Sequence, residues 1–466
     1  MTNLILNTDS YKVSHWLQYP PDMDGMFSYI ESRGGLYDRT VFFGLQAILK
    51  EFLSRPVTQA DVLEAAELFA VHGEPFNEGG WHYIVAEHGG NLPVTIRAVP
   101  EGMAVPVLNV LATVESTDPA CFWLASYLET LLLRLWYPTT VATISWHIKQ
   151  LIRHYLDQTS DDVANQLPFK LHDFGSRGVS SHESAGIGGL AHLVNFQGTD
   201  TVAALLAGRK YYSEPMAGFS IPAAEHSTIS AWGRDGEEAA YRNMIDRFGK
   251  PGAVFACVSD SYDVFAAIEH LWGARLKQKV IDSGATLVIR PDSGNPPDVV
   301  EKCALLLDRA YGSTVNSKGY KVLKHVRLIQ GDGVNEHSIG DILQRLKRSG
   351  FAADNIAFGM GGALLQQLDR DTQKFAMKCS AARIDGTWRG VYKDPVTDRS
   401  KVSKKGRLDL IRDAQGKLTT VAIGAEPHHA RSELVEVFRD GQLMTEWSFD
   451  EVRTRSEEKS GTFLVP

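Results

Sequence analysis

The spacing of hydrophobic residues changes near residue 167 and divides the chain into regions of different texture. Before that point, residues 92–115 alternate apolar and polar positions, which predicts a β-meander. A capping box that begins at Thr58 precedes apolar residues at helical spacing, and these predict a helix. A longer helical region is expected over residues 119–157, with an interruption near Pro138.

From residue 167 onward, short apolar runs end in polar or glycine-rich turns, and helical patterns follow them. The runs are FKLHDF, HLVNF, GFSIP, AVFACVSD, TLVIRPD, HVRLIQGD and NIAFG, with an eighth candidate, KFAMKCS, at residues 374–380. Apolar strands that alternate with helices favour a parallel sheet covered by helices. Seven or eight such units favour a barrel over an open sheet, so the predicted fold class is α/β.

Composition narrows the classes of protein that this chain can represent. Its 466 residues are 44% hydrophobic and 22% charged, which is typical of a globular protein with a large core. The net charge of -8 argues against a nucleic-acid partner, but it allows a local basic pocket. Four widely spaced cysteines indicate neither a disulfide framework nor a zinc knuckle. With no secretory pattern and no apolar run of about 18 residues, we expect a cytoplasmic location and no membrane partner.

Charged residues follow several of the predicted strands. Five aspartates stand directly after the apolar runs, and one arginine ends a run: Asp173, Asp200, Asp260, Asp292, Asp332 and Arg290. In a barrel the polar strand ends all face one way, and that face holds the active site. An aspartate there can bind ribose hydroxyls or a metal, although it can equally cap the next helix. An unpaired guanidinium at a strand core is costly, so Arg290 is interpreted as the partner of a phosphate or a carboxylate.

Three further motifs carry candidate chemistry, each with a plainer alternative. The GMGG run at residues 359–362 suits a phosphate at a strand-to-helix turn, or a simple tight turn. His226 is a candidate acid, base or phosphate acceptor, but spacing alone favours a capping or core histidine. Phe174 and Arg177 suit a planar ring beside negative groups, or ordinary packing next to a surface ion pair.

Several common enzyme signatures are absent from the sequence. It contains no GxGxxG fingerprint after a strand, no Walker A motif, no GxSxG and no HExxH. The commonest dehydrogenases, P-loop kinases, esterases and metalloproteases are therefore excluded. The lysines and arginines near the C-terminus are more typical of a solvated face than of a site, although their clustering in an acidic protein permits a phosphate hypothesis.

Together these segments resemble the nicotinamide phosphoribosyltransferases, a family of type II phosphoribosyltransferases. The resemblance rests on blocks that occur in order along nearly the whole chain, among them TDSYKVSHWLQYPP, KLHDFGSRGVSS, PAAEHSTI, IRPDSGNP, IQGDGV, NIAFGMGG and SKKGRL. It implies an irregular α/β barrel at residues 166–380 that carries the active site. A flanking α+β domain would be built from both chain ends, with residues 1–165 as its N-terminal part and residues 381–466 as its β-rich C-terminal part.

The resemblance also implies an activity in NAD biosynthesis. Nicotinamide and phosphoribosyl pyrophosphate would react, with Mg²⁺, to give nicotinamide mononucleotide and pyrophosphate. ATP would act as a co-substrate, and its hydrolysis through a phosphorylated histidine would improve yield and substrate affinity. The family works as a homodimer in which each active site lies at the subunit interface.

The family's residue roles fall on matching positions of this sequence. Phe174, with Tyr11 of the partner subunit, would stack on the pyridine ring, and Asp200 and Arg290 would lie near the carboxamide. His226 would be phosphorylated and oriented by Asp260. The ribose and its 5′-phosphate would be held by Asp292, Gly331, Asp332, Gly361 and Gly362. The remaining phosphates would be surrounded by Arg177 and Arg290 and by the neighbour's Arg33, Arg370, Lys378, Lys393 and Lys401.

Some positions depart from the family pattern, and other functions compete. Ser176 stands where an aromatic residue is common, and Ala256 and Ala376 replace small polar residues.

The nearest rival is a nicotinate phosphoribosyltransferase, which Asp200 opposes because its carboxylate would repel that of nicotinate. A non-catalytic binding protein would have no need of His226. An unrelated phosphate-binding barrel, such as an aldolase, would want a catalytic lysine at a strand end, and none is found.

Overall fold

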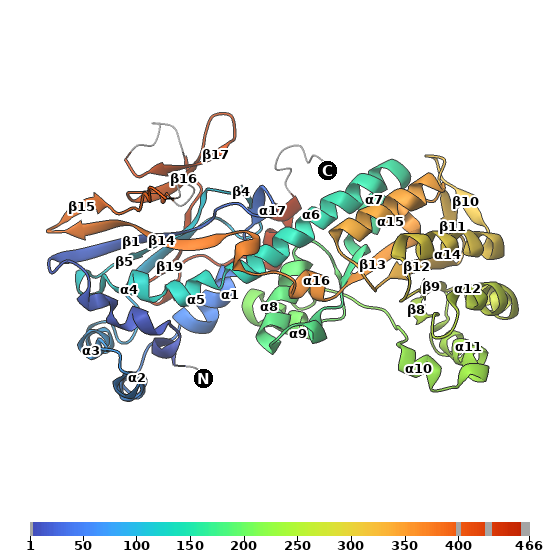
Figure 1. The fold of residues 1–466 in the computed structure, drawn as a ribbon, viewed down its shortest axis with the longest axis horizontal. Coiled ribbons are helices and arrows are strands. Elements are labelled where there is room, and N and C mark those ends of the chain that lie inside the picture. The colour runs from blue at the N-terminus through green and yellow to red at the C-terminus, as the bar shows by residue number, and fades with distance from the viewer. Residues whose placement is uncertain (1–2, 398–401, 425–430, 458–466) are drawn as a thin grey trace. The chain divides into compact units, whose positions relative to one another are not determined.

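The computed structural model describes residues 3–397, 402–424 and 431–457 (Figure 1). Its contacts form two compact units. Unit 1 comprises Met1–Thr143, Arg209–Glu214 and Leu368–Ser460, and unit 2 comprises Ile144–Gly208 and Pro215–Gln367. The divisions predicted after residues 165 and 380 differ from these. The boundary observed between Thr143 and Ile144 falls inside the continuous helix α6 (Trp136–Thr159), where no turn residue marks it in the sequence.

Unit 2 is organised around six parallel strands. Their order across the sheet is β7 (Gly198–Thr199), β6 (Leu171–Asp173), β13 (Ile356–Met360), β12 (Val326–Gln330), β9 (Thr286–Arg290) and β8 (Val254–Val258). All five pairings are parallel, as the alternation of apolar runs and helices predicts. The central strands are almost wholly buried, which explains their continuous apolar sequences.

A seventh segment, residues 219–223, joins the two edge strands of this sheet. Phe219 forms a parallel bridge with Gly198 of β7, and Ala223 forms one with Ala256 of β8. The predicted GFSIP run therefore closes the sheet into an irregular barrel, although its contacts are single bridges and not a full ladder. Two other segments predicted as barrel strands do not belong to the barrel. HLVNF lies at the end of a helix, and KFAMKCS belongs to the antiparallel sheet of unit 1.

Helices precede, connect and follow the barrel strands. They are α7 (Val163–Gln166), α8 (His182–Leu193), α9 (Val202–Tyr212), α10 (His226–Ser230), α11 (Glu237–Phe248), α12 (Val264–Ala266), α13 (Lys277–Ser283), α14 (Pro296–Tyr311), α15 (Glu336–Arg348) and α16 (Gly362–Leu365). A hairpin of β10 (Ser313–Val315) and β11 (Lys321–Leu323) follows α14. Helix α15 shows why such segments are helical, because Asn335 caps it and four apolar residues at i, i+3, i+4 and i+7 are buried.

Unit 1 contains a seven-stranded antiparallel sheet built from both ends of the chain. Its order is β15 (Thr387–Gly390), β14 (Phe375–Ile384), β1 (Met23–Ser32), β5 (Val110–Ser116), β3 (Val94–Ala98), β19 (Val435–Arg439) and β20 (Gln442–Leu443). Smaller sheets pair β2 (Arg39–Val41) with β4 (Ala104–Pro106), and β16 (Leu408–Arg412) with β17 (Leu418–Ala422) and β18 (Arg431–Ser432). The predicted meander is thus only partly right, because β4 pairs outside the main sheet.

The helices of unit 1 confirm two predictions. They are α1 (Leu45–Ile48), α2 (Gln59–His72), α3 (Glu78–Glu87), α4 (Leu124–Tyr127), α5 (Glu129–Leu133) and α17 (Phe449–Glu457). Thr58 and Asp61 form the predicted capping box of α2. The helical region predicted over residues 119–157 is interrupted near Pro138, as expected, because α5 ends at Leu133 and α6 begins at Trp136. Pro138 lies in the first turn of α6, where the backbone N–H that proline lacks has no intrahelical partner.

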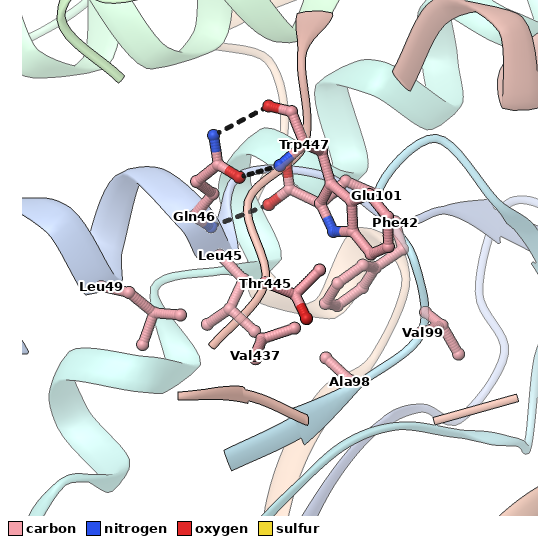
Figure 2. A pocket seen from close by; sticks show the side chains of 10 residues that line it. All are labelled: Phe42, Leu45, Gln46, Leu49, Ala98, Val99, Glu101, Val437, Thr445 and Trp447. Atoms are coloured by element: carbon pink, nitrogen blue, oxygen red, sulfur yellow. Dashed lines mark hydrogen bonds between the residues drawn. The ribbon is translucent and has the colours of Figure 1, made fainter. Parts of the chain in front are cut away.

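A buried polar cluster ties the C-terminal segment to the N-terminal part of unit 1 (Figure 2). The backbone N–H of Trp447 donates to Gln46 Oε1 at 2.7 Å, and Gln46 Nε2 donates to the Trp447 carbonyl at 3.1 Å. Glu101 accepts the backbone N–H of Gln46 at 2.8 Å and the Tyr212 hydroxyl at 2.5 Å. These bonds explain why distant parts of the sequence share one unit. Within the described residues, no helix is both long and apolar enough to cross a membrane.

Candidate active site

The polar residues predicted at strand ends gather at the carboxyl ends of the barrel strands. Phe174 follows β6, Asp200 follows β7, Asp260 follows β8, Asp292 follows β9 and Asp332 follows β12. Parallel strands end at the same face of a barrel, so the fold itself brings these side chains to one side of unit 2. The half-buried loop of Gly361 and Gly362 follows β13 at the same face.

The ring of Phe174 lies across the barrel next to a glycine. A Cβ added to Gly359 would stand 1.9 Å from Phe174 Cε2, so a side chain at that position would collide with the ring. The Phe174 backbone N–H donates to the Met360 carbonyl at 3.0 Å, which fixes the start of the loop. The half-buried ring packs on a small cluster inside the barrel formed by Ala256, Val288 and Ile329. The glycine thus leaves space for an aromatic platform.

Three different functional groups converge on Gly331, the residue after β12. A Cβ at this glycine would lie 3.4 Å from Asp292 Oδ1, 3.5 Å from Phe174 Cε2 and 3.8 Å from Arg290 Cδ. Arg290 Nη2 lies 3.6 Å from Asp292 Oδ2. Among the described residues, the buried Nε of Arg290 finds no hydrogen-bond acceptor. A buried donor without an acceptor costs about 1–3 kcal/mol, which favours an anionic ligand at this point.

His226 and Asp260 form a hydrogen-bonded pair at the start of α10. The His226 Nε2 atom lies 3.0 Å from Asp260 Oδ1, and His226 Nδ1 lies 4.0 Å from Asp292 Oδ2. The imidazole is about half exposed, whereas only 5% of the Asp260 side chain is exposed. A buried carboxylate that holds one ring nitrogen leaves the other free to act as a nucleophile.

The Asp260 carboxylate is held by more than the histidine. Its Oδ2 accepts the Ser293 hydroxyl at 2.5 Å and the Asp292 backbone N–H at 3.1 Å. Burial raises the pKa of Asp260, but the hydrogen bonds from Ser293, His226 and the Asp292 backbone outweigh it, so the net pKa is lowered. Asp260 is therefore a fixed negative charge beside the imidazole.

The pKa of Asp292 is shifted the other way. Burial raises it most, the Arg290 charge lowers it, and the neighbouring Asp260 and Asp332 charges raise it again, for a net increase. Three carboxylates thus lie close enough to influence one another. Such a group is stabilised by positive charge, whether from a cation or from hydroxyl donors of a ligand.

Asp200 lies on the exposed face beside β6 and β7. Its Oδ1 accepts the Ser220 hydroxyl at 2.5 Å, and its backbone N–H donates to the Asp173 carbonyl at 2.9 Å. Burial raises the pKa of Asp173 to about 6, although hydrogen bonds from Thr201 and Gly175 oppose this. The ring of His172 lies 6.3 Å from that of Phe174, and the Asp200 charge acts on this histidine. Asp200 is therefore near the aromatic platform.

The loops after β6 and β13 lie against each other. A Cβ at Gly178 would come within 3.7 Å of the Gly362 backbone, whereas one at Gly362 would touch nothing within 4 Å. Arg177, one residue before Gly178, is exposed at this point. The predicted phosphate-binding glycines and Arg177 are thus brought together. Asp332 is exposed at the neighbouring strand end.

The predicted residues of the neighbouring subunit lie in unit 1. Tyr11 is 56% exposed, and Arg370 and Lys393 are also exposed. Burial lowers the pKa of Lys378, Glu129 raises it, and the charges of Arg33, Lys393 and Lys12 lower it again. Arg33 has a buried Nε without an acceptor among the described residues. A basic cluster therefore exists in unit 1, whereas Lys401 lies outside the described residues.

The departures from the family pattern have definite environments. Ser176 is exposed in the turn after Phe174, so the loop carries no second aromatic ring there. Ala256 lines the barrel interior beneath Phe174, where it leaves more room than a larger polar residue would. Ala376 is buried in β14, opposite Glu31 of β1.

Two residues of the site were missed in the sequence. Ser293 and Ser220 each donate a 2.5 Å hydrogen bond to a predicted site aspartate. Ser293 lies within the IRPDSGNP block and Ser220 within the GFSIP run, so both belong to segments already identified by their patterns. Nothing in their spacing distinguishes them from ordinary turn serines, because the bonds connect different strand ends.

Comparison with known proteins agrees with this geometry. The profile of the nicotinate phosphoribosyltransferase (NAPRTase) family matches residues 169–442, and that of the nicotinamide phosphoribosyltransferase N-terminal domain matches residues 3–96. A nicotinamide phosphoribosyltransferase from Xanthomonas campestris pv. campestris is 61% identical over 461 residues, covering 98% of both chains. One from Acinetobacter baylyi is 32% identical, covering 98% of this chain and 97% of its own.

A solved structure has the same fold. The nicotinate-nucleotide pyrophosphorylase from Pyrococcus furiosus aligns with a TM-score of 0.64 at 16% identity, covering 98% of this chain and 95% of its own. At that identity the likeness concerns the fold alone. The sequence matches go further, because two family profiles occur in order and a close relative spans both chains end to end. On that basis the chain belongs to the nicotinamide phosphoribosyltransferase family.

Proposed function

We infer that this chain is a pentosyltransferase that transfers the 5-phosphoribosyl group of phosphoribosyl pyrophosphate to nicotinamide, forming nicotinamide mononucleotide and pyrophosphate. The observation that carries this inference is the convergence of Phe174, Arg290 and Asp292 within 4 Å of one point at Gly331. A flat ring, a phosphate and a ribose hydroxyl each find a suitable partner there.

The reaction exchanges one bond for another at the anomeric carbon. The pyridine nitrogen of nicotinamide forms a bond to that carbon, and the bond to the pyrophosphate oxygen breaks with its electron pair leaving on the oxygen. Positive charge develops on the ribose and negative charge on the leaving group. The Asp292 carboxylate would accept hydrogen bonds from ribose hydroxyls, and Arg290 and Arg177 would stabilise the leaving phosphates. Stacking on Phe174 would orient the ring nitrogen for attack.

Asp200 would select nicotinamide over nicotinate. Its carboxylate can accept a hydrogen bond from the carboxamide N–H₂ but would repel the carboxylate of nicotinate. The hydroxyl of Ser220 fixes one carboxylate oxygen, which leaves the other available. The variant Asp200→Ser should relax the preference toward nicotinate. Unchanged selectivity would remove Asp200 from this role.

We propose that ATP is a co-substrate and that it phosphorylates His226. The γ-phosphoryl group would move to an imidazole nitrogen, ADP would leave, and hydrolysis of the phosphohistidine would complete the cycle. The 3.0 Å contact with Asp260 supports this, because a fixed carboxylate orients the ring and raises its nucleophilicity. The buried, acceptor-free Nε of Arg290 supports an anion nearby.

We propose Mg²⁺ as the metal cofactor. The donor set fits, because hard carboxylate oxygens of Asp292 and Asp332 lie at the strand ends. Burial, and to a lesser degree the charges of Asp260 and Asp332, raise the pKa of Asp292, so a cation there would be stabilising. The Asp292 and Asp332 carboxylates, together with substrate oxygens, would hold the ion. When bound, it would neutralise charge on pyrophosphate.

We also propose a homodimer with shared active sites, in a reducing, cytoplasmic location. The basic cluster and the exposed Tyr11 in unit 1 support a shared site, because phosphates and a pyridine ring would complement them. The four free cysteines fit a reducing compartment. Mixing His226→Ala with Lys378→Ala protein, each expected to lack ATP-stimulated turnover, should restore that turnover if two chains build each site. A mixture without ATP-stimulated turnover, despite subunit exchange, would contradict sharing.

The decisive experiment measures product from purified protein with phosphoribosyl pyrophosphate and Mg²⁺. Nicotinamide or nicotinate is offered, each with and without ATP. Mononucleotide from nicotinamide, stimulated by ATP, is the expected result. Product mainly from nicotinate would indicate the sister activity. Folded protein without product from either base would favour a binding role.

A further inference from the structure

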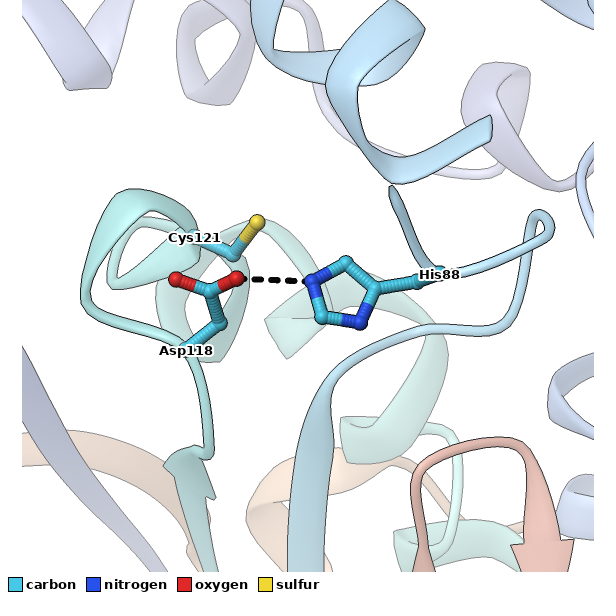
Figure 3. A group of neighbouring side chains, drawn as sticks. All are labelled: His88, Asp118 and Cys121. Carbon is cyan, nitrogen blue, oxygen red and sulfur yellow. Dashed lines mark hydrogen bonds and ion pairs between the residues drawn. The ribbon is translucent and has the colours of Figure 1, made fainter. Parts of the chain in front are cut away.

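A cluster of three metal-ligand side chains lies in unit 1 and takes no part in the proposed reaction (Figure 3). It consists of His88, Asp118 and Cys121, and one ligand atom from each lies within 4.8 Å of the other two. His88 follows α3, whereas Asp118 and Cys121 belong to the turn that precedes α4, so two separate segments contribute. Within the described residues, no other group of three such side chains meets this spacing.

We propose that His88, Asp118 and Cys121 bind a single zinc ion that clips the end of α3 to the turn before α4. An imidazole nitrogen, a carboxylate oxygen and a thiolate are the three donor types that zinc prefers in proteins. Bond lengths of about 2.0–2.3 Å put tetrahedral zinc ligands about 3.3–3.8 Å apart. The cluster therefore needs adjustments of about 1 Å to surround an ion.

The backbone already holds these donors in position. The His88 N–H donates to the Ile84 carbonyl at 3.1 Å, and the Cys121 N–H donates to the Asp118 carbonyl at 3.0 Å. The Asp118 carboxylate also accepts the Ala120 N–H at 2.8 Å. Because the segments are fixed by hydrogen bonds of their own, little further ordering is needed when a metal binds.

Burial around the cluster suits a metal with one open position. The Cys121 side chain is fully buried, whereas 26% of the His88 side chain and 18% of that of Asp118 are exposed. An ion can therefore enter from the exposed side, and water can complete its coordination there. The Tyr83 hydroxyl donates to Asp118 Oδ2 at 3.1 Å, which supplies the outer hydrogen bond that metal-bound carboxylates commonly have.

The simpler alternative is an ordinary hydrogen bond between His88 Nε2 and Asp118 Oδ2, which lie 2.7 Å apart. In that alternative the Cys121 side chain only packs in the hydrophobic core of unit 1, and its sulfur binds nothing. The active site offers zinc only carboxylates and a histidine. A thiolate ligand therefore distinguishes binding at the His88, Asp118 and Cys121 cluster from weak binding at the active site. The test is therefore built on the sulfur.

The experiment uses the full chain, stripped of metal and kept free of Mg²⁺. It is titrated with Zn²⁺ against a chromogenic chelator, and separately with Co²⁺, whose bond to a thiolate gives a near-ultraviolet charge-transfer absorption. The variants are Cys121→Ser and, as a control with an equally buried cysteine, Cys303→Ser.

We expect one tight Zn²⁺ per chain and the Co²⁺–thiolate absorption in the wild type and in Cys303→Ser. Cys121→Ser should lose the absorption and bind Zn²⁺ on the order of 100-fold more weakly. If Cys121→Ser does not fold, His88→Ala provides the same comparison at a partly exposed position. Absence of tight Zn²⁺ binding to the wild type would overturn the proposal. So would Zn²⁺ binding and Co²⁺–thiolate absorption that survive in Cys121→Ser, or tight Zn²⁺ binding that survives in His88→Ala.

Discussion

The contact between Gly359 and Phe174 yields the sharpest prediction about the site. Replacing the glycine with alanine puts a Cβ 1.9 Å from Phe174 Cε2. Ordinary carbon contacts begin near 3.5 Å, so the ring must move by about 1.5 Å or the strand must distort. The ring packs on Ala256, Val288 and Ile329, which leaves it little room to retreat into the barrel.

The expected loss of activity follows from the proposed role of the Phe174 ring in positioning nicotinamide. Aromatic stacking contributes about 0.5–1.5 kcal/mol beyond buried area, and a misplacement of about 1 Å near the reacting atoms can cost on the order of 100-fold in rate. We therefore expect Gly359→Ala to lower kcat/KM for nicotinamide by about 10-fold to 100-fold. Overpacking should also lower stability by about 1–3 kcal/mol. Initial rates at varied nicotinamide, with saturating phosphoribosyl pyrophosphate, provide the measurement.

Gly340→Ala is the matched control. This glycine lies within α15 in the same unit, and an added Cβ would meet only Leu151, at 3.7 Å or more. It should leave nicotinamide kinetics unchanged and stabilise the helix by up to about 1 kcal/mol. If Gly359→Ala retains wild-type kcat/KM for nicotinamide, then Phe174 does not position the ring and the reasoning fails.

Three further outcomes follow from the site. Asp260→Asn should slow labelling of the enzyme by γ-³²P-ATP about 100-fold while ATP-independent turnover persists, and unchanged labelling would contradict the pairing with His226. Because the Asp260 carboxylate accepts from His226 Nε2, Nδ1 is the free nucleophile, so isomer-specific antibodies should detect 1-phosphohistidine and not the 3-isomer. Burial raises the pKa of Asp173 in the folded protein to about 6, so the protonated carboxyl favours the folded state. This contribution to stability is complete below the ordinary pKa of 3.8 and is lost as pH rises through about 6. The difference between 3.8 and about 6 corresponds to about 3 kcal/mol of folding free energy, and denaturant unfolding of Asp173→Asn should lack that pH dependence between pH 4 and 6.

The sequence predicted those parts of the fold whose signals are local. Continuous apolar runs such as TLVIR and VRLIQ are buried on both faces only in a covered parallel sheet, and both are barrel strands. The capping box at Thr58 marks the start of α2, since its hydrogen bonds lie within four residues. By contrast, KFAMKCS has the apolar pattern of a barrel strand, but pairing with β1 placed it in unit 1.

The candidate site divides in the same way. The sequence alone determined that aspartates, Phe174 and the glycine loop follow successive strands, and parallel topology then requires them to share one face of the barrel. Only the tertiary structure decided which side chains meet. The hydrogen bonds from Ser293 to Asp260 and from Ser220 to Asp200 connect residues 33 and 20 positions apart. Such contacts depend on strand order and on where each loop turns, and neither quantity is encoded in the residues next to them.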